Sequence, residues 1–180
     1  PPRPGPPSGG NGRRPTPGRG MNPERVFIGL GANLGDAQAT VNAAFEALAA
    51  LPGTRVLARS SLYRTAPVEA QGPDFVNAVA ELRSTLEPEA LLQALQAIEA
   101  RHDRQRPYRN APRTLDLDLL FVGERTITTP TLTVPHPRLH QRAFVLEPLL
   151  ELAPGFTHPA LGALALWRAG TAGQAIERLP

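Results

Sequence analysis

The stretch Leu115-Asp116-Leu117-Asp118-Leu119-Leu120-Phe121 alternates apolar and acidic residues and then becomes wholly apolar. This alternation is typical of a β-strand, in which successive side chains point to opposite faces and rise about 3.3 Å per residue. Asp116 and Asp118 should therefore share one face, with their Cα atoms roughly 6.5–7 Å apart. Two carboxylates this close resist ionising together. The pattern predicts a cationic partner, and Mg²⁺ is a natural candidate because it prefers hard oxygen ligands.

An arginine-rich segment precedes this strand. Residues 101–113 hold five arginines, among them Arg104, Arg106, Arg109 and Arg113. The planar guanidinium group binds phosphate oxygens in a bidentate fashion. Guanidinium groups beside paired carboxylates suit polyphosphate transfer, because metal ions bridge the phosphates and arginines neutralise charge in the transition state. A solvated charged loop is the alternative interpretation of the arginines taken alone.

The elements around this strand predict an α+β fold. Further strands are expected over 25–30, 55–63 and 75–82, and helices over 37–50 and 88–101. Asp36 suits the N-cap of the first helix, and Pro88 suits the first turn of the second. The resulting order, βαββαβ, is that of ferredoxin-like proteins. Additional helical pieces are expected near 140–150 and 160–178.

Composition limits the class of protein. The chain has 180 residues, enough for one domain with a sizeable core, and no apolar stretch approaches the roughly 20 residues of a membrane span. It has no cysteine, which excludes disulfides and thiolate metal sites, and no lysine, which excludes a Walker A phosphate loop. No signal-peptide pattern opens the chain, so a cytoplasmic location is expected.

The basic character of the chain is concentrated at its beginning. Residues 1–20 carry four arginines, no acid, seven prolines and six glycines, whereas the remainder carries 15 arginines and 16 acidic groups. A segment of this composition cannot bury enough apolar surface to offset its ordering entropy. We therefore expect a disordered leader over 1–20 and a single domain over 21–180. Because that domain is nearly neutral, nucleic-acid binding is not expected; an arginine-rich contact with nucleic acid is the alternative for the leader.

Other motifs are less specific when taken singly. Phe75 and Asn77 share one face of a predicted strand and suit a planar heterocycle, although Phe75 as a plain core residue is an equal alternative. The motif Gly29-Leu30-Gly31-Ala32-Asn33-Leu34-Gly35 imitates a dinucleotide fingerprint, but Leu34 stands in place of the third glycine. We interpret it as a tight turn between a strand and a helix. No spacing of His and Glu predicts a zinc site.

Taken together, these motifs resemble the 6-hydroxymethyl-7,8-dihydropterin pyrophosphokinase family of folate biosynthesis over most of residues 25–153. The matching blocks are Gly29-Leu30-Gly31-Ala32-Asn33-Leu34, Ser61-Leu62-Tyr63-Arg64-Thr65, Phe75-Val76-Asn77-Ala78, Pro112-Arg113-Thr114-Leu115-Asp116-Leu117-Asp118, Leu132-Thr133-Val134-Pro135-His136-Pro137 and Arg142-Ala143-Phe144. The resemblance implies a ferredoxin-like fold with additional strands and C-terminal helices. It also implies transfer of diphosphate from ATP to the pterin hydroxymethyl group, with release of AMP.

The resemblance further implies a set of site residues. Asp116 and Asp118 match ligands of two Mg²⁺ ions, and Arg104 and Arg113 match catalytic arginines that engage the triphosphate. The positions that match pterin contacts are Thr65, Val68, Phe75, Asn77 and Phe144. The positions that match ATP contacts are Gln96, Glu99, Arg106, Arg109, Leu119, Thr133, His136 and Arg142. A monomer without membrane or nucleic-acid partners is expected. An arginine-rich nucleic-acid-binding module and another metal-dependent Asp-x-Asp phosphoryl or nucleotidyl enzyme are the alternatives.

Overall fold

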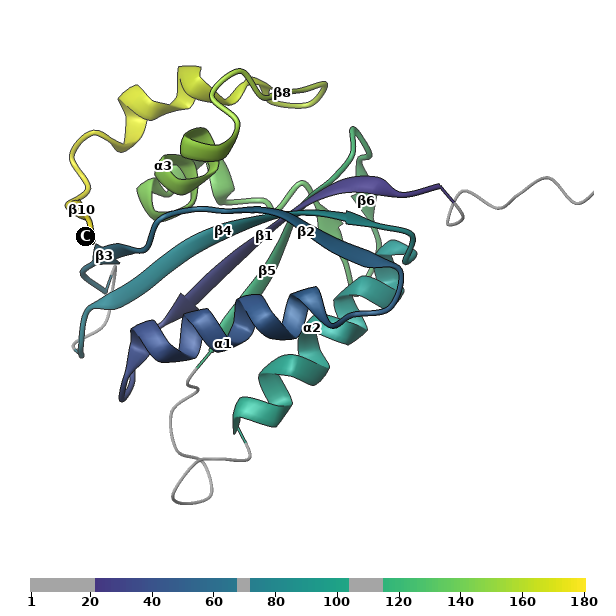
Figure 1. Cartoon of the computed structure of the whole chain (residues 1–180). Coiled ribbons are helices and arrows are strands. Elements are labelled where there is room, and N and C mark those ends of the chain that lie inside the picture. The colour runs from purple at the N-terminus through teal and green to yellow at the C-terminus, as the bar shows by residue number, and fades with distance from the viewer. Residues whose placement is uncertain (1–21, 68–71, 104–114) are drawn as a thin grey trace, which may run out of the picture.

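The computed structural model of the chain describes residues 22–67, 72–103 and 115–180, which form a sheet with helices on both faces (Figure 1). The core elements are β1 (Glu24–Ala32), α1 (Ala37–Ala49), β2 (Thr54–Arg59), β3 (Tyr63–Thr65), β4 (Phe75–Ser84), α2 (Pro88–Asp103) and β5 (Asp116–Val122). This order is the predicted βαββαβ, with the second strand of the pattern divided into β2 and β3. The predicted leader over 1–20 lies outside the described residues.

Strand register brings residues distant in sequence into one row. β1 lies between β4 and β5, and all of its pairings are antiparallel. β2 and β3 pair with successive parts of β4, and β10 (Ile176–Arg178) extends the sheet beyond β3. Gly31 is paired with Asn77 on one side and with Asp116 on the other. Because paired residues share a face, the side chains of Asn77 and Asp116 are on the same side of the sheet.

The strand predicted over 55–63 is interrupted at Ser60. The Oγ atom of Ser60 accepts a hydrogen bond of 2.8 Å from the backbone N–H of Val79 and donates one of 2.8 Å to the carbonyl of Ser61. A side chain that bonds to nearby backbone competes with the ladder of a regular strand. This competition explains why one expected strand is observed as two.

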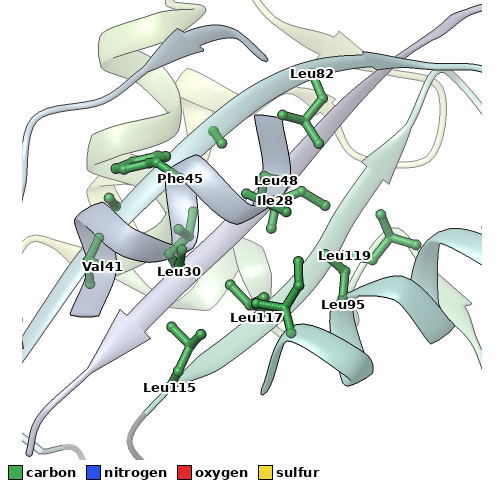
Figure 2. Packing of buried hydrophobic residues seen from close by; sticks show 14 of the residues in the cluster. Ile28, Leu30, Val41, Phe45, Leu48, Leu82, Leu95, Leu115, Leu117 and Leu119 are labelled. Carbon is green, nitrogen blue, oxygen red and sulfur yellow. The ribbon is translucent and has the colours of Figure 1, made fainter. Parts of the chain in front are cut away.

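Different elements cover the two faces of the sheet (Figure 1). α1 and α2 cover one face, where they form the larger apolar core with alternate residues of β1, β4 and β5. Figure 2 shows Phe45 and Leu48 of α1 beside Ile28 and Leu30 of β1. The other face carries α3 (Ala143–Leu152), which packs in a second apolar cluster that includes Phe27.

The C-terminal part differs from its prediction. The helix near 140–150 is present as α3, preceded by the 3-10 helix η2 (Leu139–Gln141). The helical piece expected near 160–178 is present only as the 3-10 helix η3 (Leu164–Thr171), because the end of this region forms strand β10. Gly170 and Gly173 weaken helix propensity here, and the edge of β3 offers hydrogen-bond partners to β10.

Two short hairpins complete the described fold. They are formed by β6 (Ile127–Thr128) with β7 (Thr133–Val134), and by β8 (Thr157–His158) with β9 (Gly162–Ala163). Within the described ranges, no helix is both long and apolar enough to cross a lipid bilayer.

Candidate active site

A cleft of about 870 Å³ opens on the face of the sheet that carries α3. It contains both predicted metal ligands, four of the five predicted pterin residues and two of the predicted ATP residues. The residues that line it are Gly29, Leu30, Gly31, Thr65, Ala66, Phe75, Asn77, Ala78, Asp116, Asp118, His136, Arg138, Gln141, Arg142, Phe144, Val145 and Gln174. Folding therefore gathers residues from both ends of the described chain around one site.

Asp116 and Asp118 reach the cleft because β5 alternates as predicted. The leucines that alternate with them are at most 5% exposed and belong to the core beneath α1 and α2. Asp118 is half-buried and Asp116 is exposed. Across β1 the aspartates are paired with Gly29 and Gly31. No side chain of these β1 partners stands between the carboxylates and the floor of the cleft.

Only the end of the motif Gly29–Gly35 forms the predicted turn between a strand and a helix. Gly29 and Gly31 lie within β1 on the cleft face, whereas Gly35, with φ of +59°, lies in the turn before α1. A Cβ atom at Gly31 would approach Oδ1 of Asn77 to 3.0 Å, while one at Gly29 would make an ordinary contact of 3.5 Å with Leu120. Residues two apart on a strand point to the same face. The Gly-Leu-Gly spacing could therefore have predicted that Gly29 and Gly31 share one face of β1.

Asn77 is held in one orientation at the floor of the cleft. It is 5% exposed, and its Nδ2 donates a hydrogen bond of 2.7 Å to Oγ1 of Thr65 on β3. Within the described part of the chain, no group donates a hydrogen bond to Asn77 Oδ1. This oxygen is an acceptor available to a ligand, and Gly31 leaves the space beside it open.

Two aromatic rings border the cleft. Phe75 begins β4 and Phe144 lies in the first turn of α3, and both rings are half-buried. The guanidinium carbon of Arg142 lies 5.4 Å from the centroid of the Phe144 ring, a geometry suited to a cation–π interaction. The cleft thus combines aromatic surface and a cation with the two carboxylates.

His136 lies against β5, and its surroundings favour the neutral ring. Its backbone N–H donates to the carbonyl of Leu120 at 3.1 Å, and its Nδ1 accepts a hydrogen bond of 3.3 Å from the backbone N–H of Arg138. Burial lowers the pKa of His136; Asp118 opposes this effect, and the charges of Arg142 and Arg138 lower the pKa further. Since Nδ1 is an acceptor, the neutral ring carries its proton on Nε2.

Four further predicted ATP residues lie within the described ranges and do not line the cleft. The carboxylate of Glu99 on α2 accepts a hydrogen bond of 3.2 Å from the backbone N–H of Leu117, and Gln96 is exposed on the same helix. The side chain of Leu119 is 4% exposed in the core, and Thr133 is exposed on β7. The predicted residues Val68, Arg104, Arg106, Arg109 and Arg113 lie outside the described residues.

The aspartate pair suits a metal that is bound together with a phosphate ligand. In the ranges that the structure describes, no group of three or more His, Cys, Asp or Glu side chains could hold a metal ion. Mg²⁺ is commonly bound by one or two carboxylates, with phosphate oxygens and water as its other ligands. Asp116 and Asp118 fit that donor set.

Three polar residues of the cleft were not predicted from the sequence: Arg138, Gln141 and Gln174. Arg138 is two residues from His136 in the same loop, and this proximity to a predicted ATP residue was a weak indication that Arg138 also lies in the cleft. Gln174 is far in sequence from every predicted site residue, and no local pattern connects it with the cleft.

Comparison with known proteins identifies the family. A family model described as 7,8-dihydro-6-hydroxymethylpterin-pyrophosphokinase (HPPK) matches residues 27–154. A Pseudomonas aeruginosa protein named 2-amino-4-hydroxy-6-hydroxymethyldihydropteridine pyrophosphokinase is 46% identical over 158 residues, which cover 87% of this chain and 98% of that protein. A Synechocystis protein with the same name is 42% identical over 137 residues, covering 76% of this chain and 70% of that protein.

Solved structures share the fold. A triple mutant of Plasmodium falciparum HPPK-DHPS with STZ-DHP gives a TM-score of 0.67 at 13% identity, covering 82% of this chain and 43% of that chain. This chain therefore spans less than half of that protein, and at such low identity the likeness concerns the fold alone. It confirms the predicted α+β fold. The family match and the sequence relatives also confirm the predicted family, and the chain belongs to the 7,8-dihydro-6-hydroxymethylpterin-pyrophosphokinase (HPPK) family.

Proposed function

We propose that this protein transfers the β,γ-diphosphate of ATP to the hydroxymethyl group of 6-hydroxymethyl-7,8-dihydropterin, giving AMP and the pterin diphosphate for tetrahydrofolate biosynthesis. Membership of the HPPK family makes it an ATP-dependent diphosphotransferase. The observation that carries the proposal is that one cleft contains the paired aspartates, the Asn77 amide and two phenylalanine rings. These are groups suited to a metal-bound polyphosphate and to a flat heterocycle.

The pterin is proposed to bind between Phe75 and Phe144. Aromatic faces stack on planar heterocycles, and both rings border the cleft. The available Oδ1 of Asn77 is suited to accept a hydrogen bond from a pterin N–H, while the hydrogen bond to Thr65 keeps the amide in place. Val68, which lies outside the described residues, stays a predicted pterin contact.

The phosphates are proposed to bind beside β5. Two Mg²⁺ ions held by Asp116 and Asp118 would offset the phosphate charge. Arg142 adds positive charge in the same cleft. The neutral ring of His136 can donate from Nε2 to a phosphate oxygen. Arg104 and Arg113 are proposed to engage the triphosphate during catalysis. The remaining ATP contacts are proposed at Gln96, Glu99, Arg106, Arg109, Leu119 and Thr133.

In the proposed reaction, the hydroxymethyl oxygen attacks the β-phosphorus of ATP in line. The bond from the β-phosphorus to the oxygen that bridges it to the α-phosphorus breaks, AMP leaves with that oxygen, and the hydroxyl proton is released to solvent. His136 does not suit the role of general base, because its Nδ1 already accepts a hydrogen bond and its Nε2 carries the proton. Positioning and charge neutralisation should therefore provide most of the rate enhancement.

The two alternative functions, a nucleic-acid-binding module and another Asp-x-Asp enzyme, explain fewer of the residues that line the cleft. A nucleic-acid-binding module does not require Asp116 and Asp118, and another Asp-x-Asp enzyme does not require Phe75, Asn77 and Phe144 together. We further propose that the protein acts as a monomer in the cytoplasm. The division into a leader over 1–20 and a domain over 21–180 stays a prediction.

The test is formation of AMP by the full chain with ATP, Mg²⁺ and 6-hydroxymethyl-7,8-dihydropterin. We expect AMP and pterin diphosphate in equal amounts, and neither product when the pterin or the metal is omitted. AMP formed at the same rate without the pterin would contradict the proposal, as would transfer of a single phosphate with release of ADP. The Asp118→Asn variant, assayed alongside, controls for a contaminating activity.

A further inference from the structure

Gln174 connects the C-terminal part of the chain to the start of α3. Its Oε1 accepts a hydrogen bond of 2.8 Å from the backbone N–H of Ala143, the first residue of α3. Its Nε2 donates one of 2.8 Å to the carbonyl of Gln141 in η2. A single side-chain amide thus bonds to the backbone on both sides of the junction between η2 and α3, across 31 and 33 residues of sequence.

These bonds supply a cap that the local sequence lacks. The first N–H groups of an α-helix have no acceptor within the helix, and Arg142, at the N-cap position, makes no side-chain capping bond. Gln174 provides the acceptor for Ala143 instead. Arg142 and Phe144 are the neighbours of Ala143 in the chain, and both line the cleft. The positions of these two side chains therefore depend on backbone that Gln174 holds.

Gln174 is itself attached to the sheet. β10 begins two residues later, with Ile176 paired to Thr65 of β3, and the C-terminal segment runs from the side of α3 to the sheet edge at β3 (Figure 1). The backbone N–H of Leu179 donates a hydrogen bond of 2.8 Å to the carbonyl of Leu62, and the Leu179 side chain is 8% exposed. The segment 174–179 thus joins the start of α3 to the strand that carries Thr65.

We propose that Gln174 is a positioning residue for the cleft. By holding the start of α3, it sets the positions of Phe144 and Arg142 and thereby the affinity for the ligand that stacks on Phe144. The identity of that ligand as 6-hydroxymethyl-7,8-dihydropterin rests on the proposed function. The family match ends at residue 154, so Gln174 lies beyond the part of the chain that the match covers.

The variant Gln174→Met tests the proposal in the full chain, because it removes both hydrogen bonds and nearly preserves the length of the side chain. We expect the Ala143 amide to exchange with solvent about five- to tenfold faster. We also expect the Kd of the pterin, measured with Mg²⁺ and a non-hydrolysable ATP analogue, to rise about tenfold. The single-turnover rate at saturating substrates should stay within about threefold of wild type.

The matched control is Gln38→Met, the same change at an exposed residue of α1 on the other face of the sheet. It should change neither the exchange of Ala143 nor the Kd. Thermal unfolding of each variant identifies a temperature at which all of them are fully folded, and the Kd is measured at that temperature. A variant that has only lost overall stability should then bind the pterin with the wild-type Kd. If Gln174→Met fails to fold, Gln174→Asn, which retracts the amide by one methylene, replaces it with the same expected results.

Faster exchange of Ala143 with an unchanged Kd would overturn the positioning role, and unchanged exchange would overturn the capping contact on which it depends. A wild-type protein that binds no pterin would instead refute the proposed function. In that case the exchange of the Ala143 amide still decides whether Gln174 holds the start of α3.

Discussion

A Cβ atom at Gly31 would lie 3.0 Å from Oδ1 of Asn77. The two residues are paired across β1 and β4, and the absence of a side chain at Gly31 leaves the Asn77 oxygen accessible from the cleft. The amide cannot move aside without cost, because its Nδ2 is bonded to Thr65 at 2.7 Å. This close approach defines the floor of the candidate site.

Gly31→Ala should therefore weaken pterin binding while leaving the fold intact. The added methyl group displaces the Asn77 amide or covers its oxygen, and loss of that hydrogen bond should raise the Kd of the pterin about tenfold. The free energy of unfolding should change by less than about 1 kcal/mol, because alanine also restricts the unfolded chain. Titration calorimetry and urea unfolding measure the two effects. Gly155→Ala is the matched control, because Gly155 lies outside the cleft and an added Cβ atom there meets no atom within 4 Å. An equal rise in Kd in both variants would contradict the argument.

Asp116→Asn and Asp118→Asn should each lower the rate of AMP formation by at least about 100-fold. Both carboxylates line the cleft, and the neutral amide is a poorer ligand for Mg²⁺. Neither change should alter the thermal unfolding profile strongly, because neither aspartate is fully buried. The rate is measured over a range of Mg²⁺ concentrations, with the exposed carboxylate Glu124→Gln as the control. Near-normal rates in either aspartate variant would rule out the proposed role of the pair.

Arg104→Ala and Arg113→Ala should reduce the chemical step more than ATP affinity. The reason is that arginines which neutralise developing charge act mainly in the transition state. We expect the single-turnover rate to fall at least about tenfold and the Kd of ATP to change less. Arg55→Ala on β2, an exposed arginine, controls for the loss of one positive charge. A rise in Kd without a change in the single-turnover rate would show that these arginines only bind ATP.

Glu151 is a hydrogen-bond centre between α3 and the sheet. It accepts hydrogen bonds from the backbone N–H of Ser61 at 2.6 Å and from the hydroxyl of Tyr63 at 3.1 Å, and it pairs with Arg178 at 3.1 Å. Burial alone would raise the pKa of Glu151, but these hydrogen bonds and the charge of Arg178 outweigh it and hold the pKa below its usual value. Burial, reinforced by Glu151, raises the pKa of Tyr63 to about 12.

The lowered pKa of Glu151 predicts a pH dependence of stability. Between the folded and unfolded pKa values the unfolded chain binds more protons, so the contribution of Glu151 is complete above the unfolded value near 4.5 and is lost as the pH falls through the folded value. Glu151→Gln should reduce the free energy of unfolding by about 1–2 kcal/mol near neutral pH. At pH values below the unfolded pKa, the difference in the free energy of unfolding between Glu151→Gln and wild type should become smaller. Urea unfolding over the acid range measures it, and a difference that is independent of pH would contradict the prediction.

Local patterns predicted most elements because strand and helix periodicity depend only on nearby residues. The alternation around Asp116 predicted the face of β5 that meets the cleft. Asp36 predicted the start of α1, where its side chain accepts a hydrogen bond from the backbone N–H of Ala39. The interruption at Ser60 and the strand β10 were not predicted. Each depends on a partner from elsewhere in the chain: the N–H of Val79 for Ser60, and the open edge of β3 for β10.

By itself, the sequence determined the order of the core elements, the family and the common face of Asp116 and Asp118, because these follow from motifs and from local backbone geometry. Only the tertiary structure decided that Gly31 lies beside Asn77 and that Gln174 holds the start of α3. The first relationship depends on the register between β1 and β4. The second depends on the return of the C-terminal segment to the sheet edge, a contact that no pattern within one segment encodes.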